Sequence, residues 1–270
     1  MVIIIFSIIT GLLIKHLFFW KPESRSHFYK SKSPLFIAHR GTHKNTPENT
    51  ISAIKEAINS GFSIIELDVF LSLDKEIVCS HNIDLERETE GQGFLDEKHS
   101  KALQDILYRS YNANDKEKCI PLLSDILKNF NKNILFVLDV KTKRINHLNP
   151  ALEIVKLIKK HDAKMSVVVS SFNPILLLFI KCIDKKILTG FIFQNHRFLN
   201  LTNIIHPDFI HPRGDLINKR LIRYSNKKNL PINTWTVNNN LSWNWLSSMG
   251  VCGIITDEIQ DFIPGKQINL

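Results

Sequence analysis

Short apolar runs alternate with amphipathic stretches along most of the chain. Eight of these runs indicate buried strands, and segments with helical periodicity lie between most of them. The predicted strands are Leu35–His39, Ser63–Phe70, Ile134–Val140, Val167–Ser171, Leu188–Phe193, Asp208–His211, Ile232–Val237 and Gly253–Thr256. The clearest predicted helix is Asn49–Ser60, which follows Pro47 and stops before Gly61. Eight strands alternating with helices predict an α/β fold, a (β/α)8 TIM barrel over residues 34–270.

One further apolar run, Glu76–Ser80, does not fit the alternation. It follows the second strand after a turn at residues 73–75, which predicts a hairpin. The hairpin would return His81 to the mouth of the barrel, near His39. Residues 82–121 then predict a small insertion after the second strand.

The first twenty residues are almost wholly apolar, and Lys15 and His16 interrupt the run. About 20 apolar residues suffice to cross a bilayer, so residues 1–20 predict a transmembrane helix that anchors the protein. A signal peptide is the alternative, but the basic n-region and small-residue cleavage site are missing. Residues 21–33 predict a basic linker, with positive charges at Lys21, Arg25, Lys30 and Lys32. These charges predict that the folded domain lies on the cytoplasmic side of the membrane.

Composition agrees with one barrel domain. The chain has 270 residues, of which 44% are hydrophobic, a size at which single (β/α)8 barrels occur. The net charge of +9 suits either anionic lipid headgroups or nucleic acid. Because the lysines are scattered and no basic-aromatic motif stands out, we expect a membrane partner and no nucleic acid. The four cysteines show no Cys-x-x-Cys spacing, which argues against a zinc site or disulfide framework.

Titratable groups interrupt or end three of the predicted strands. Glu66 and Asp68 lie two residues apart in the second strand, so their side chains share a face. Two inward carboxylates are costly unless a positive group compensates them, which predicts a divalent metal. A single buried ion pair with Arg40 is the alternative.

Asp139 lies near the end of the third strand, and Lys141 follows it with the same spacing. Asp139 offers a third oxygen ligand, and Lys141 can meet an anionic substrate. Two histidines, His39 and His81, can divide acid and base work near neutral pH. Together with Arg40 these groups suit metal-assisted cleavage of a phosphodiester.

At these residues the chain resembles the glycerophosphodiester phosphodiesterases, over a region from about Leu35 to about Phe262. Each motif is weak alone, but seven in the same order are a strong signal. The motifs are His39-Arg40-Gly41, Pro47-Glu48-Asn49-Thr50, Glu66-x-Asp68, His81, Asp139-x-Lys141, Trp235-Thr236-Val237-Asn238 and Thr256-Asp257.

The resemblance implies a role for seven residues and a pair of products. The acid and base would be His39 and His81, the phosphate ligands Arg40 and Lys141, and the metal ligands Glu66, Asp68 and Asp139. Oxygen ligands suit Mg²⁺, Ca²⁺ or Mn²⁺. The substrate would be a glycerophosphodiester or a lysophospholipid, and the products a phosphomonoester such as glycerol 3-phosphate and an alcohol. Attack by water and attack by a substrate hydroxyl both remain open.

Two positions depart from the family pattern. Asp139 stands where glutamate is common in the family. Some membrane-anchored members that resemble lysophospholipase D enzymes also have aspartate there. Asn82 follows His81 where an aspartate is usual, which would weaken any charge effect on the imidazole. A catalytically silent, membrane-tethered binder of phospholipid headgroups is therefore the alternative function. Retention of both histidines and all three acids favours the enzyme.

Three other residues have two interpretations each. Glu48 either braces Arg40 or caps the helix that follows. Trp235 either packs in the barrel or forms a wall against the alcohol part of the substrate. His211 ends a predicted strand and matches no ligand spacing, so it is either a packed histidine or part of the site.

Overall fold

The computed structural model describes residues 2–23, 34–42, 44–109 and 119–258. Most of the predicted basic linker, at residues 24–33, lies outside the described residues. The same holds for residues 110–118 of the predicted insertion and for residues 259–270.

Eight parallel strands form the central sheet, as predicted. Their spatial order is β7-β6-β5-β4-β2-β1-β9-β8. Parallel bridges Ile210↔Ile232 and Arg213↔Trp235 join the two ends of this series, which closes the sheet into a barrel. The strands are β1 (Leu35–Ala38), β2 (Ile64–Leu71), β4 (Leu135–Val140), β5 (Val167–Ser171), β6 (Leu188–Phe193), β7 (Phe209–Pro212), β8 (Asn233–Thr234) and β9 (Gly253–Thr256).

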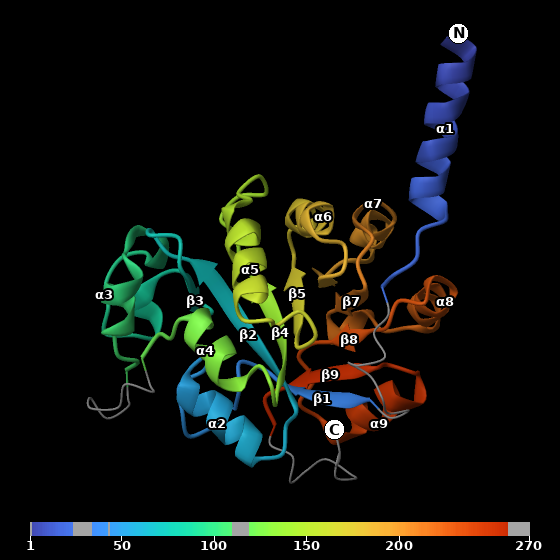
Figure 1. Cartoon of the computed structure of the whole chain (residues 1–270). Helices are drawn as coiled ribbons and strands as arrows, with labels where there is room; N and C mark the ends of the chain where they lie inside the picture. Colours follow the sequence, from blue (N-terminus) through green and yellow to red (C-terminus); the bar gives the residue numbers. More distant parts are fainter. Residues whose placement is uncertain (1, 24–33, 43, 110–118, 259–270) are drawn as a thin grey trace.

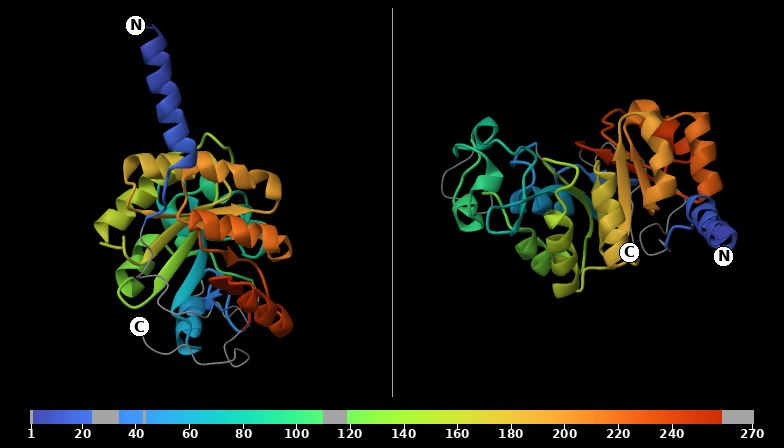
Figure 2. Two further views of the ribbon diagram at one scale, coloured as in Figure 1. Left: turned by 90° about the vertical axis from the view of Figure 1, so that its right-hand side faces the viewer. Right: turned by 90° about the horizontal axis from the view of Figure 1, so that it is seen from above.

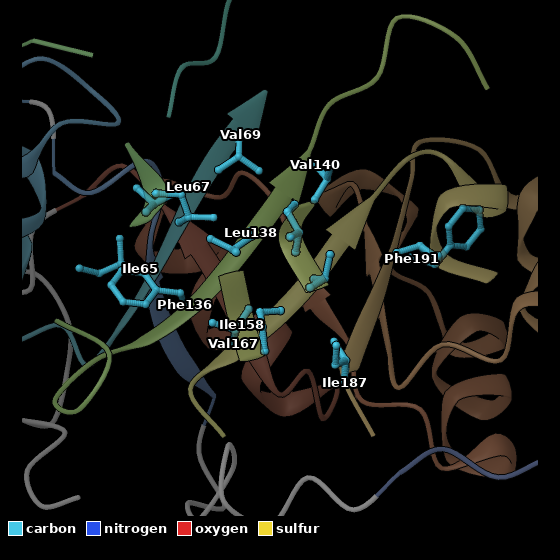
Figure 3. Packing of buried hydrophobic residues seen from close by; sticks show 14 of the residues in the cluster. Ile65, Leu67, Val69, Phe136, Leu138, Val140, Ile158, Val167, Ile187 and Phe191 are labelled. Atoms are coloured by element: carbon cyan, nitrogen blue, oxygen red, sulfur yellow. The ribbon is translucent and has the colours of Figure 1, made fainter. Parts of the chain in front are cut away.

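Helices pack on the outside of the barrel (Figure 1). They are α2 (Ile51–Asn59), α4 (Leu123–Phe130), α5 (Asn149–Lys160), α6 (Pro174–Ile183), α7 (Thr202–Ile205), α8 (Lys219–Lys228) and α9 (Asn240–Ser248). Alternate residues of β2, namely Ile65, Leu67 and Val69, belong to the large apolar core between sheet and helices (Figure 3). Since side chains alternate along a strand, the residues between them face the barrel interior.

The barrel interior changes character along its axis. Ile64, Val137 and Phe209 belong to an apolar cluster that fills its lower part. One step further along β2 and β4, the inward positions are Glu66 and Asp139. The polar positions therefore gather at the carboxyl ends of the strands, where barrels of this type carry their active sites.

The predicted hairpin strand is present as β3 (Ile77–Cys79), antiparallel to β2. After it come short helical segments η1 (Leu85–Arg87), η2 (Leu95–Glu97) and α3 (Ser100–Gln104). They enclose a small core of their own, formed by Val78, Leu85, Leu95, Leu103, Tyr108 and Ile120. The insertion is thus a packed unit joined to the edge of β2.

The predicted transmembrane helix over residues 1–20 is not supported. Helix α1 spans Val2–Phe18, 17 residues, and projects from the barrel (Figures 1 and 2). No helix in the described part of the chain is long and apolar enough to cross a membrane.

Residues at and just after the end of α1 contact the barrel. Trp20 stacks on His206, with ring centroids 4.8 Å apart, and its indole donates to Asn203 at 3.4 Å. His16 lies 3.2 Å from the carbonyl of Ile204. These two residues contact α7 and the residue after it. The cytoplasmic orientation stays a prediction.

Candidate active site

His39 follows β1 and is held by an acid that follows β9. Its Nδ1 lies 2.5 Å from Oδ1 of Asp257. The side chain of Asn238 donates to the other carboxylate oxygen at 2.7 Å, and the Asp257 amide donates back to Asn238 at 2.9 Å. When the imidazole is neutral, this carboxylate places its proton on Nδ1 and leaves the lone pair on Nε2.

Asp257 is absent from the predicted site residues, although its motif is part of the family resemblance. The register of the barrel explains the contact, because Ala38 of β1 pairs with Thr256 of β9. The next residue of each strand is then His39 on one side and Asp257 on the other. The sequence signal for this role was an acid directly after the last predicted strand. Only the pairing of β9 with β1 brings that acid to His39.

Arg40 is turned back over β2 by an unusual backbone. Its φ is +58° and that of Gly41 is +78°. A Cβ on Gly41 would lie 2.7 Å from Ala53, so this turn requires glycine. In this conformation the Arg40 amide donates to Oε2 of Glu66 at 3.1 Å, and Nε lies 3.0 Å from Oδ2 of Asp68.

Glu48 contacts Arg40, whereas another residue caps the helix. Nη1 of Arg40 donates to both carboxylate oxygens of Glu48 at 2.8 Å. The N-cap of α2 is Thr50, whose hydroxyl accepts from the amide of Ala53. Of the two interpretations of Glu48, the structure shows the contact with Arg40.

Glu66, Asp68 and Asp139 converge as the strand spacing predicts. Asp68 and Asp139 are cross-strand partners of β2 and β4. One oxygen from each of the three acids lies within 4.8 Å of the others, and all three side chains are buried. Lys141 contacts two of them, with Nζ 2.8 Å from Asp68 and 2.5 Å from Asp139.

The electrostatics of this cluster are unbalanced toward negative charge. Burial, together with Asp68 and Asp139, raises the pKa of Glu66 well above its ordinary value. Burial and Asp68 likewise raise the pKa of Asp139, against the effect of Lys141. Burial would also raise the pKa of Asp68, but Lys141 and Arg40 outweigh it and lower that pKa. Two cations thus face three carboxylates, and one cation, Arg40, is shared with a fourth acid, Glu48.

These residues fit a divalent cation. Oδ1 of Asp139 is buried and finds no hydrogen-bond partner among the described residues. Buried carboxylates need positive compensation, and carboxylate oxygens are the donors that hard cations prefer. The buried acidic triad is therefore a possible metal site.

Asn49 supports the triad, a role that the sequence prediction did not assign. The predicted helix starts at Asn49, but the φ of this residue is +58° and the helix begins two residues later. Its side chain is fully buried and donates to Asp68 at 3.2 Å, while its oxygen accepts from the Asp68 amide at 2.9 Å. A buried amide that bonds both backbone and carboxylate holds Asp68 in one rotamer.

His81 and His39 line the same cavity, of about 210 Å³. Burial, assisted by Arg40 and Lys141, lowers the pKa of His81, although Asp68 opposes it. Asn82, the departure from the family pattern, accepts a hydrogen bond from Arg87 of the insertion at 3.2 Å.

Phe172, Trp235 and His211 also line this cavity. The rings of Phe172 and Trp235 meet edge to face at 5.6 Å, and the Trp235 indole donates to the His211 carbonyl at 2.7 Å. His211 lies 3.1 Å from the amide nitrogen of Asn233, and burial lowers its pKa to about 3. It is therefore neutral near pH 7 and accepts this hydrogen bond.

Comparison with known proteins agrees with this geometry. Residues 39–261 match the model of the glycerophosphoryl diester phosphodiesterase family. The chain belongs to this family. It is 30% identical over 243 residues to the glycerophosphodiester phosphodiesterase of Caldanaerobacter subterraneus subsp. tengcongensis, covering 85% of this chain and 96% of that one. A Bacillus altitudinis enzyme of the same name is 29% identical, covering 82% of this chain and 93% of that one.

Solved structures show the same fold. An Oleispira antarctica phosphodiesterase in complex with the product sn-glycerol-3-phosphate superposes with a TM-score of 0.77 at 22% identity, covering 85% of this chain and 95% of that one. The Thermotoga maritima glycerophosphodiester phosphodiesterase gives a TM-score of 0.71 at 23% identity, covering 85% of this chain and 97% of that one.

The family match and the similarity to the Caldanaerobacter enzyme identify the activity. The chain is a glycerophosphodiester phosphodiesterase, which hydrolyses glycerophosphodiesters to glycerol 3-phosphate and an alcohol. The predicted membrane-anchored, lysophospholipase D-like subgroup gains no support.

Proposed function

We propose that His39 and His81 perform the acid and base steps of this hydrolysis, while Arg40 and Lys141 bind the phosphate. The observation that carries the proposal is one cavity in which both histidines, both cations and the acidic triad meet. A silent binder of headgroups would need the cations but not two imidazoles beside them.

The chain's own residues account for charge and proton transfer. Arg40 and Lys141 offset the negative charge of the phosphate, and this charge grows on the oxygens as the bond to the leaving group breaks. One imidazole accepts the proton of the attacking oxygen, and the other donates a proton to the departing alkoxide. Asp257 favours the His39 tautomer whose Nε2 can accept a proton.

Glu66, Asp68 and Asp139 would hold a divalent cation, which we propose to be Mg²⁺, Ca²⁺ or Mn²⁺. When bound, it supplies positive charge that stabilises the phosphate during cleavage. Asp139 is shorter than glutamate, so Asp139→Glu should retain more metal affinity than Asp139→Ala.

The test measures phosphomonoester release from glycerophosphocholine and lysophosphatidylcholine, with and without chelator. His39→Ala and His81→Ala should each lower turnover by a factor on the order of 10²–10⁴ with little change in the thermal unfolding midpoint. His99→Ala is the matched control, because His99 is exposed on the insertion. If either active-site variant kept near-wild-type turnover, that histidine would be neither acid nor base. Comparable rates on the two substrates would extend the substrate class to lysophospholipids.

A further inference from the structure

A second cavity, of about 310 Å³, adjoins the catalytic one, and we call it the outer cavity. Lys141 and Phe172 line both spaces, so the two cavities meet at these side chains. The outer cavity is otherwise lined mainly by Phe70, Ile83, Thr142 and Lys143. Phe172 stands between them with its ring partly exposed.

The insertion fixes the rim of the outer cavity. Ile83 belongs to the insertion, and Lys143 follows β4 on the barrel side. Nζ of Lys143 lies 2.7 Å from Oδ1 of Asp96 and 5.0 Å from the centre of the Phe94 ring. Both partners are in the insertion, so this ion pair ties the two sides of the rim together.

The lining combines carbon surface with positive charge. Phe70, Ile83 and Phe172 present hydrocarbon, while the amide of Asn173 is already committed to Thr142 at 3.1 Å and to a backbone carbonyl. The charged side chains that line the cavity, in the described part of the chain, are Lys141 and Lys143. Both are ion-paired, but their partners Asp68, Asp139 and Asp96 do not line this cavity, so the ammonium groups are the charges that it presents. A cationic ligand would therefore meet charges of its own sign, which is a direct source of discrimination.

A phosphodiester has two arms, and the catalytic cavity of about 210 Å³ meets a second space at Lys141 and Phe172 that could take one of them. With the phosphate against Arg40 and Lys141, the space on the far side of Lys141 is the outer cavity. We propose that the outer cavity binds the leaving alcohol of the diester and selects an uncharged alcohol over a cationic one. This proposal rests on the proposed function, because it assumes that the phosphate lies at Lys141.

The experiment compares two substrates that share the glycerophosphoryl group, glycerophosphoglycerol and glycerophosphocholine. The wild-type enzyme should show at least a tenfold higher kcat/KM on the neutral alcohol. Lys143→Met removes an ammonium group and leaves Asp96 unpaired at the rim, so it should lower this ratio at least threefold, through a gain on the choline substrate. Lys143→Glu should lower it further.

Lys164→Met is the matched control. Lys164 forms a similar ion pair, 2.6 Å from Asp184, and precedes β5 at the opposite end of the barrel. Its substitution should leave the substrate ratio unchanged. Lys143 and Lys164 are both partly exposed, at 42% and 34%, so thermal melts should show folded protein in each case.

The outcomes separate this proposal from the proposed function. A wild-type enzyme active on both substrates, with a ratio that neither Lys143 variant changes, would overturn the outer cavity as the alcohol site and leave the function intact. An equal change in the Lys164 variant would also overturn it, because the effect would then follow net charge. A wild-type enzyme inactive on both substrates would overturn the proposed function first.

Discussion

Replacing Asp257 by asparagine changes one atom of the site and reverses the hydrogen bond offered to His39. Asn238 donates through its Nδ2 to Oδ2 of Asp257, while its own oxygen accepts from the Asp257 amide at 2.9 Å and the Thr256 hydroxyl at 3.0 Å. The orientation of the Asn238 amide is therefore fixed. In Asp257→Asn the new side chain must turn its oxygen to Asn238 and its NH₂ group to His39.

The magnitude follows from the proton on His39. An NH₂ group facing Nδ1 favours the tautomer with the proton on Nε2, the nitrogen that should accept one. Losing a hydrogen bond to a charged group costs about 1.5–3 kcal/mol, or about 10- to 150-fold in rate. The wrong tautomer adds to this, and the same substitution in a serine protease triad lowers kcat about 10⁴-fold. We expect kcat to fall by a factor of about 10²–10⁴ with KM nearly unchanged, because Asp257 does not line the cavity in which we propose that the phosphate binds.

Steady-state kinetics on glycerophosphocholine test this, with a swap of the two side chains as the rescue. In Asn238→Asp combined with Asp257→Asn, the new amide can donate to the new carboxylate and turn its oxygen back to His39. The double variant should recover at least tenfold of the lost kcat. A double variant as inactive as the single one would refute the tautomer argument. The loss of the negative charge beside His39, which the two variants share, would then explain the whole effect.

Three further predictions concern the same cavity. Because the pKa of Glu66 is raised in the folded protein, its contribution to stability is present below about pH 4.3 and is lost as pH rises through the folded pKa. Metal-free Glu66→Gln should therefore melt above metal-free wild type at pH 8, and saturating Mg²⁺ should reverse the order; differential scanning fluorimetry measures both. Gly190→Ala would place a Cβ 2.5 Å from Ser170 Oγ and 2.8 Å from His211 Nε2, and should lower the urea-derived free energy of unfolding by about 1–3 kcal/mol; an unchanged value would mean that His211 can move. Glu48→Gln should raise KM about tenfold with a smaller effect on kcat, because Arg40 loses its charged partner, and a fall in kcat alone would instead assign Glu48 to the chemical step.

The barrel and most of its site could be predicted from local patterns. Buried parallel strands are apolar on both faces, so the carboxylates of Glu66, Asp68 and Asp139 were conspicuous in such runs. A spacing of two residues puts groups on one face, and a parallel barrel brings the ends of its strands to one rim. These rules predicted the meeting of the acids with Lys141, Arg40 and both histidines.

Two predicted helices differ from those in the structure. An apolar run of twenty residues predicted a transmembrane helix, whereas α1 spans Val2–Phe18 and no helix in the described residues is long and apolar enough to cross a membrane. Asn49 looked like the start of a helix, but its amide satisfies Asp68, and this contact delays the helix to Ile51.

The remaining features belong to the tertiary structure alone. The sequence determines which faces of the strands are polar, because side-chain alternation is a local property of the backbone. It does not determine which strand ends become neighbours across the closed barrel. The pairing of β9 with β1 brings Asp257 to His39, and the loops after β4 and β5 meet the insertion to form the outer cavity. Those contacts join residues far apart in the chain, and packing decided them.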